Sequence, residues 1–418
     1  MEIAIPCGRE DLALVLPPRA DILEPRHAPV LNDPEEAVAA ALRDPVEGPP
    51  LADLARGRKT ACVVISDITR PVPNRVILSP LLKTLELEGI GRTEITILIA
   101  TGTHRPNVGQ ELAALVGEQI AATFRFMNHD CRNPEGYRRI GELEGAPVEI
   151  NRVYLEADLK ILTGLIEPHP YAGYSGGAKS ILPGLSSLET MKFMHSFKMI
   201  AHPRVTNSVL DGNPFYEATT DVARLAGVDF IVNAMINKDK APVGFFAGAL
   251  EGAHRAGCRM ANDLSVIRME KPADLVITSG GGAPMDATFY QCGKGILAAK
   301  DICRPGGTVI MVCGCALGIG SDTYAELVKG CSSLEVFERK YSDPQNFVMD
   351  QWAVQSYFQA LNRIGRVLVY SPGLSAEQLS PFGVQKIDHL QGTVDSLLPE
   401  SPRVAAMPQG PYVVGLAG

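Results

Sequence analysis

The sequence contains no apolar run of about 18 residues, and its first residues show no basic segment followed by an apolar one. We therefore expect neither a membrane-spanning helix nor a secretory signal, and we predict a cytoplasmic location. Basic residues are also in the minority, because 39 Lys and Arg stand against 47 Asp and Glu, for a net charge of -8. Nucleic-acid binders concentrate positive charge, so this balance argues against that class, and an anionic substrate would need a local basic site.

Paired cysteine spacing is absent as well. The nine cysteines lie mostly in apolar surroundings and include no C-x-x-C pair of the kind found in zinc sites. Most of them are therefore predicted to be buried thiols. Cys313 and Cys315, separated by one glycine, are the only close pair, and a redox or metal role is left open for them.

Internal repeats and low-complexity tracts are missing too, whereas the ingredients of a folded α/β protein are plentiful. Hydrophobic residues make up 46% of the 418 and charged residues 21%, and this length predicts two or three domains. Short β-branched runs alternate with glycine-bearing turns and helix-like stretches, which is typical of a parallel α/β sheet. The predicted strands are 61–66, 95–100, 160–166, 230–237, 274–278, 307–312 and 366–370.

We predict two Rossmann-like parallel-sheet domains with an active-site cleft between them. The first covers residues 1–267 and includes a helical stretch at 249–263; the second covers 273–402 and includes an amphipathic helix at 285–303. A charged patch at 268–272 suits a linker. The tail 403–418 ends in a strand-like segment that is predicted to return to the first domain.

Polar side chains follow two of the predicted strands where each strand ends. Asp67, Thr69 and Arg70 come after the strand 61–66, and His104 comes after the strand 95–100. Ligands bind beyond the carboxyl ends of such strands. Arg70 could bind a carboxylate or phosphate, Asp67 could accept hydrogen bonds from sugar hydroxyls or from a neighbouring histidine, and His104 could exchange protons. An ordinary turn and a surface histidine remain the alternatives.

The third strand end carries His169 and a glycine-rich strip that leads to Lys179. Its backbone amides could wrap a phosphate, and the strip resembles a P-loop. However, Ala178 stands where a P-loop has its last glycine, and Pro183-Gly184 would stop the long helix that a P-loop opens. An ATPase is therefore disfavoured, and Lys179 needs another explanation.

His195 ends a helix predicted to begin after a capping box at Ser186 and Glu189. It shares the apolar face of Leu188 and Met191. Such a histidine is either a core residue bonded to a backbone carbonyl or a single metal ligand, with a cofactor supplying the other donors.

The second domain offers a candidate substrate surface on its first helix. Tyr290 and Lys294 are four residues apart and share a helical face, with Gln291 beside them. If this face points into the cleft, Lys294 and Arg70 would hold an anion from opposite domains. The only tryptophan, Trp352, either covers the pocket or packs in a core.

Taken together, these motifs resemble the nickel-pincer lactate racemase family, whose members are 2-hydroxy-acid racemases and epimerases. The resemblance spans nearly the whole chain and depends on several separated motifs in the correct order. The motifs are Asp67-x-Thr69-Arg70-Pro71, Gly102-Thr103-His104-Arg105, His169 through Gly184, His195, and Tyr290-Gln291-x-x-Lys294.

The resemblance implies a cofactor that spacing alone does not reveal, a nickel-pincer nucleotide (a Ni(II) pyridinium-3,5-bisthiocarboxylic acid mononucleotide). It would be joined to Lys179 as a thioamide, with His195 as the protein ligand to nickel. Asp67, Thr69, Gly176 and Gly177 would lie against the cofactor. The enzymes that make this cofactor would be partners.

The resemblance also implies an isomerase that inverts C2 of a small 2-hydroxy acid by hydride transfer to the cofactor. His104 and His169 would be the catalytic acid/base pair. The substrate would contact Arg70, Tyr290, Gln291, Lys294 and Trp352.

Other functions remain open at this point. The same residues could belong to a nucleotide-binding regulatory protein in which the histidines are structural. A zinc hydrolase is disfavoured because no two of these histidines have ligand spacing with a nearby Glu or Cys. Within the racemase chemistry, malate, longer-chain and sugar acids are alternatives to lactate.

Overall fold

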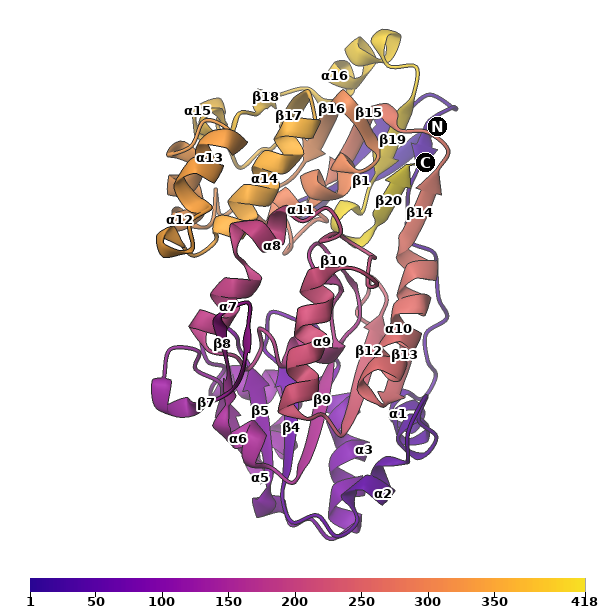
Figure 1. The fold of residues 1–418 in the computed structure, drawn as a ribbon. Helices are drawn as coiled ribbons and strands as arrows, with labels where there is room; N and C mark the ends of the chain where they lie inside the picture. The colour runs from indigo at the N-terminus through magenta and orange to yellow at the C-terminus, as the bar shows by residue number, and fades with distance from the viewer. Residues whose placement is uncertain (418) are drawn as a thin grey trace. The chain divides into compact units, whose positions relative to one another are not determined.

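A computed structural model describes residues 1–417 and divides the chain into two compact units. Among the described residues, unit 1 contains 1–26, 195–202 and 264–417, and unit 2 contains 27–194 and 203–263. Each unit is built on one six-stranded sheet with helices around it (Figure 1). Among the described residues, no helix is both long and apolar enough to cross a membrane.

The sheet of unit 2 has the strand order β13-β12-β9-β4-β5-β6. All neighbours are parallel except β12 and β13, which are antiparallel. In chain order the strands are β4 (Ala61–Ser66), β5 (Ile95–Ala100), β6 (Arg125–Asn128), β9 (Leu159–Leu165), β12 (Phe230–Ile236) and β13 (Pro242–Gly248).

The helices and small hairpins of unit 2 surround this sheet. Apolar side chains of β4, β5 and β9 form one core with those of the first three helices. The helices are α1 (Pro34–Arg43), α2 (Leu51–Ala55), α3 (Asn74–Leu87), α4 (Gln110–Val116), α5 (Glu118–Thr123), α6 (Arg152–Glu156), α7 (Leu188–Met194), α9 (Pro214–Ala226) and α10 (Leu250–Ser265). The hairpins are β7 (Tyr137–Leu143) with β8 (Ala146–Asn151), and β10 (Pro168–His169) with β11 (Gly173–Tyr174).

The sheet of unit 1 is entirely parallel and has the order β18-β17-β16-β15-β19-β3. In chain order the strands are β3 (Asp21–Ile22), β15 (Ala273–Ser279), β16 (Cys303–Val312), β17 (Arg366–Tyr370), β18 (Gln385–Ile387) and β19 (Val404–Met407). Two smaller pairs complete the unit: antiparallel β1 (Glu2–Cys7) and β2 (Glu10–Val15), and parallel β14 (Val266–Met269) and β20 (Val414–Ala417).

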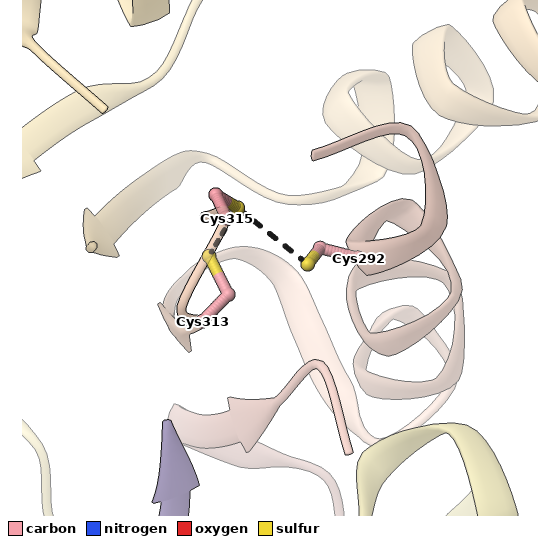
Figure 2. A group of neighbouring side chains, drawn as sticks. All are labelled: Cys292, Cys313 and Cys315. Atoms are coloured by element: carbon pink, nitrogen blue, oxygen red, sulfur yellow. Dashed lines mark hydrogen bonds between the residues drawn. The ribbon is translucent and has the colours of Figure 1, made fainter. Parts of the chain in front are cut away.

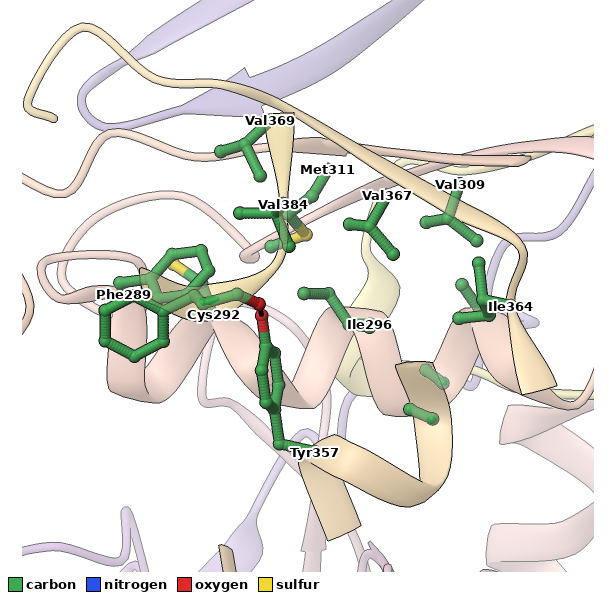
Figure 3. Close-up of a cluster of buried hydrophobic side chains, with 14 of the residues drawn as sticks. Phe289, Cys292, Ile296, Val309, Met311, Tyr357, Ile364, Val367, Val369 and Val384 are labelled. Carbon is green, nitrogen blue, oxygen red and sulfur yellow. Dashed lines mark hydrogen bonds between the residues drawn. The ribbon is translucent and has the colours of Figure 1, made fainter. Parts of the chain in front are cut away.

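Alternate residues of the unit 1 strands point into two different cores, as expected for a parallel sheet covered on both faces. Val276, Val309 and Val367 join the helical core, which Figure 3 shows around Phe289 and Tyr357. The residues that alternate with them along the same strands point to the opposite face of the sheet, where they pack against the β1–β2 hairpin and α16. The helices are α8 (Phe197–Ala201), α11 (Phe289–Lys300), α12 (Asp322–Lys329), α13 (Leu334–Tyr341), α14 (Gln351–Arg363), α15 (Ala376–Leu379) and α16 (Leu390–Leu397).

The predicted fold class is confirmed, but two placements along the chain were wrong. The tail 403–418 does not return to the sheet of residues 61–248, because β19 lies between β15 and β3, and β20 pairs with β14. The patch 268–272 is only partly a linker, because β14 runs to Met269. The amino-terminal residues and the segment 195–202 also belong to unit 1, so the units interleave along the chain.

Candidate functional site

The carboxyl edge of the unit 2 sheet collects the loops that carry most of the predicted residues. Strands β9, β4 and β5 are parallel neighbours, so the loops that follow them meet at one edge. The chain passes from β4 outward to β5 and β6, then returns to the other side of β4 as β9. This reversal creates a topological switch point between β4 and β9, the usual ligand site of an open α/β sheet.

Asp67 and His104 form a hydrogen-bonded pair from two of these loops. Their Oδ2 and Nδ1 atoms are 2.7 Å apart, and the carboxylate is buried while the imidazole is largely exposed. Asp67 also accepts hydrogen bonds from the backbone N and Oγ1 of Thr69. Burial raises the pKa of Asp67, but the hydrogen bonds from His104 and Thr69 outweigh it and leave this pKa below its ordinary value.

The pairing fixes which nitrogen of His104 can take up a proton. An ionised carboxylate only accepts hydrogen bonds, so Nδ1 of His104 donates to Asp67 and carries the ring hydrogen. In the neutral ring Nε2 is then a free base site, pointing away from the carboxylate that orients the ring. The sequence-based suggestion that Asp67 accepts from a nearby histidine is confirmed as a contact.

His169 has the opposite arrangement. It lies in β10, and its Nδ1 accepts hydrogen bonds from the backbone N–H groups of Tyr171 and Ala172, at 3.1 and 3.2 Å. A nitrogen that accepts is unprotonated, so the hydrogen of the neutral ring is on Nε2. His104 is therefore held as a base at Nε2, and His169 as a donor at the same position.

Lys179 lies in the 3₁₀ turn η3 (Gly177–Ser180) beyond β9. Its ammonium nitrogen is 5.2 Å from the ring centroid of Phe215. Within residues 1–417 no carboxylate forms an ion pair with it. Burial, assisted by the positive charge of Arg70, lowers the pKa of Lys179 to about 7. A large fraction of its amine is thus neutral and nucleophilic near neutral pH.

Arg70 is paired with Glu167, a residue that the sequence did not single out. The two side chains are 2.8 Å apart and come from the loops after β4 and β9, on either side of the switch point. The ion pair fixes one guanidinium nitrogen and leaves the guanidinium half-buried beside Lys179. The only sequence signal for Glu167 was its position directly after a predicted strand.

Close packing explains why glycine occupies positions 176 and 177 in the segment that leads to Lys179. The Gly177 N–H donates to Asn233 Oδ1 at 2.9 Å, so this amide is already satisfied inside the protein. A Cβ atom at Gly176 or Gly177 would lie 2.8 Å from Asn233 or His254, respectively. The short turn η3 confirms that no long helix follows, as Pro183-Gly184 indicated. Direct contact of Gly176 and Gly177 with a cofactor stays a prediction.

The remaining predicted residues lie in unit 1. His195 follows α7, which ends at Met194, and is buried with its ring centroid 4.6 Å from that of Trp352. Tyr290 donates to Asp350, which precedes the helix of Trp352. Gln291 is half-buried and Lys294 exposed on the same helix, α11. The helix α7 is capped by Ser187 and not by Ser186, because Ser186 is engaged in a β-bridge with Ile150.

Comparison with known proteins decides the family. Residues 7–208 match the model of the lactate racemase N-terminal domain, and residues 268–413 match that of the lactate racemase C-terminal domain. The chain belongs to the lactate racemase family. Enzymes of this family are racemases, so the chain is an isomerase.

Two relatives named lactate racemase resemble this family member over most of their length. The Thermoanaerobacterium thermosaccharolyticum enzyme is 37% identical over 360 residues, which cover 84% of each chain. The Lactiplantibacillus plantarum enzyme is 36% identical over 333 residues, covering 78% of this chain and 77% of the relative.

Solved structures agree with this assignment. The lactate racemase apoprotein from Thermoanaerobacterium thermosaccharolyticum has a TM-score of 0.93 at 33% identity, with 99% of this chain and all of that chain covered. A Thermotoga maritima protein has a TM-score of 0.68 at 18% identity, over 93% of this chain and 99% of its own, and supports the fold alone.

Proposed function

We infer that this enzyme inverts the C2 centre of lactate or a closely related 2-hydroxy acid with a nickel-pincer nucleotide joined to Lys179. The observation that carries the inference is the state of Lys179. Its pKa is lowered to about 7, and its amine has no carboxylate partner in the described chain. The names of the relatives point to lactate as the first substrate to test.

The residues fit this cofactor by their chemistry. Thioamide formation would join a neutral amine to the thiocarboxyl carbon with loss of water, and Lys179 supplies such an amine. Nickel(II) accepts sulfur and imidazole ligands, and His195, whose ring is packed against Trp352, would offer the imidazole. The bound cofactor supplies a hydride acceptor for C2 of the substrate. Asp67 and Thr69 form the loop proposed to lie near it.

His104 and His169 are the groups that we propose for proton transfer. We propose that Nε2 of His104 takes the hydroxyl proton of one enantiomer, while the Asp67 carboxylate stabilises the imidazolium that forms. His169 delivers a proton from Nε2 to the oxygen of the 2-keto acid when it begins the turnover as an imidazolium, and it ends as the neutral ring seen here, whose Nδ1 accepts two backbone hydrogen bonds. Reaction of the other enantiomer begins with His169 neutral and His104 protonated, so the two histidines exchange roles and each turnover takes up one proton and delivers one.

Substrate orientation is assigned to charged and aromatic side chains of both units. In unit 2, Arg70 is held by Glu167 and can direct its remaining N–H groups at a carboxylate. In unit 1, Lys294 is exposed and offers a second positive charge, while Tyr290 and Gln291 share its helix. Trp352, packed on His195, is the proposed apolar wall beside the substrate.

The test uses protein produced together with the enzymes that make the cofactor. We expect intact mass spectrometry to show a covalent adduct on Lys179, stoichiometric nickel, and interconversion of D- and L-lactate. Lys179→Ala should lose the adduct and the activity. Lys192→Ala, at a half-buried lysine paired with Glu189, is the matched control and should keep both. Unmodified Lys179 without nickel in active protein would refute the proposal.

The substrate is tested separately. Inversion of lactate, malate, longer aliphatic and sugar 2-hydroxy acids should be followed with the same cofactor-loaded protein. A higher kcat/KM for one of the other acids would leave the chemistry in place and replace lactate as the substrate. Loss of turnover in His104→Ala and His169→Ala distinguishes the racemase from a nucleotide-binding regulator, in which these variants would retain function.

A further inference from the structure

Three cysteines far apart in the sequence meet inside unit 1. Cys292 lies on α11, and Cys313 and Cys315 lie in the turn directly after β16. Their sulfur atoms point toward one another (Figure 2), with 3.8 Å between Cys292 and Cys315 and 3.5 Å between Cys315 and Cys313. All three side chains are completely buried and none forms a disulfide. We call these residues the cysteine cluster.

The spacing of the cysteine cluster matches that of metal-bound thiolates. A tetrahedral zinc ion with Zn–S bonds of about 2.3 Å holds its sulfur ligands about 3.8 Å apart. The two separations given above are 3.8 and 3.5 Å, and all three sulfur atoms lie within 4.8 Å of one another. Small side-chain rotations would therefore bring the three sulfurs around a single ion.

A buried carboxylate lies beside the cysteine cluster. Asp286 has no exposed surface, and its Oδ2 accepts hydrogen bonds from the N–H groups of Gly8 and Gly314, both at 2.7 Å. Its Oδ1 has no hydrogen-bond partner, and no lysine or arginine pairs with it among residues 1–417. The backbone connects it to the cluster, because Asp286 O accepts from Cys315 N at 2.8 Å. A buried carboxylate with an unused oxygen is costly unless a cation is near.

We propose that the cysteine cluster is a structural zinc site in which Cys292, Cys313 and Cys315 are the thiolate ligands, with Asp286 as a buried acidic residue whose backbone contacts the cluster. Binding would displace the three thiol protons to solvent as three Zn–S bonds form, with no change of oxidation state. The site would connect the start of α11 to the turn after β16. It shares no residue with the proposed nickel ligand His195.

The first measurement is metal content. Full-length protein produced in zinc-supplemented medium without the cofactor-making enzymes should retain zinc in a ratio of about one per chain after gel filtration. Cys292→Ser and Cys315→Ser should lose this zinc. The control is Cys303→Ser, because Cys303 is equally buried in the same unit but outside the cluster, and it should keep the zinc. His195→Ala should also keep it, which separates this site from the nickel site.

A second measurement does not depend on the stability of the variants. X-ray absorption of the zinc-loaded wild-type protein should show three sulfur neighbours at about 2.3 Å, and replacement by Co(II) should give an intense sulfur-to-cobalt charge-transfer band. A shell of nitrogen and oxygen alone, failure of the wild type to take up zinc, or full zinc retention in both cluster variants would overturn the proposal. Racemase activity does not enter either readout, so this result is independent of the proposed function.

Discussion

At the scale of single residues, the site is organised by hydrogen bonds that select the tautomers of two histidines. His104 is held by an acceptor, the Asp67 carboxylate, whereas His169 is held by two backbone donors. The two imidazoles therefore differ in which nitrogen carries hydrogen, although their chemical type is the same. The sequence identified both histidines from their positions after strands, but tautomers depend on contacts that only the folded chain creates.

Asp67→Asn tests the orientation of His104. The amide keeps the size of the carboxylate but loses its charge, and it can rotate to donate to Nδ1 and so select the wrong tautomer. We expect kcat of the cofactor-loaded enzyme to fall about 10²- to 10⁴-fold, with the lysine adduct unchanged by mass. Thr69→Val, which removes one hydroxyl bond to Asp67 and keeps the charge, is the milder control. Activity near wild type in Asp67→Asn would exclude this role.

The lowered pKa of Lys179 gives a pH prediction for the protein without cofactor. The amine is protonated below its pKa and reactive above it, so acylation of Lys179 should be half-maximal near pH 7. An ordinary lysine has a pKa of about 10.4. Arg70→Gln removes the nearby positive charge and should move the midpoint upward. Peptide mass spectrometry after brief labelling across pH 6–10 measures both values, and a midpoint near that of an ordinary lysine would disprove the assignment.

At the scale of elements, apolar patterning predicted the strands well and the caps less well. The ranges 61–66, 95–100 and 366–370 coincide with β4, β5 and β17, because each is an apolar run with polar residues at both ends. The helix predicted at 285–303 is shorter, because Thr288 caps it by accepting from Gln291 N. Caps depend on which oxygen reaches which amide, and that geometry is not contained in the periodicity.

The turn η3 gives a prediction about packing. Gly177 has a φ of +52° and would place a Cβ atom 2.8 Å from the His254 ring, whereas Gly89 has a φ of +92° with open space around it. Substitution of Gly89 by alanine therefore adds only the strain of a positive φ, whereas substitution of Gly177 adds this strain and a steric clash with the His254 ring. We expect losses in unfolding free energy of about 1 kcal/mol for Gly89→Ala and about 2–4 kcal/mol for Gly177→Ala.

Urea denaturation of the two variants and the wild type would measure this difference. Equal losses would show that the contact with His254 relaxes without cost. His254 itself is well anchored for the comparison, because its Nε2 donates to Ser175 O at 2.9 Å and burial lowers its pKa to about 4. The ring is therefore neutral at the pH of such an experiment.

At the scale of the whole molecule, the interleaving of the two units along the chain could not be predicted from the sequence. Local patterns predicted domains at 1–267 and 273–402, but β3 near the amino terminus pairs with β19 near the other end. Nothing in the two short segments marks them as partners, since pairing of parallel strands depends on the assembled sheet. The cysteine cluster was missed for the same reason, because Cys292 is distant in sequence from the close pair Cys313 and Cys315.

This interleaving predicts that residues 273–402 do not fold by themselves. The fragment lacks β19 and β3 from its sheet, and it lacks the β1–β2 hairpin that contributes Ile5 and Leu14 to one of its cores. We expect no cooperative thermal transition by circular dichroism. A polypeptide in which 264–418 is joined through a linker to 1–26 restores these strands and is the matched comparison. A sharp transition for the short fragment would contradict the prediction.

The pairing of β3 with β19 also has a consequence for synthesis on the ribosome. The first residues of the chain emerge long before their sheet partner is translated, so they must wait with apolar side chains such as Leu14 and Leu16 exposed. Unit 2 has all of its residues by position 263 and can assemble first. Closing unit 1 then requires contacts across nearly the full length of the chain, the slow class of folding event. Unit 2 should therefore become protease-resistant on stalled nascent chains before unit 1 does.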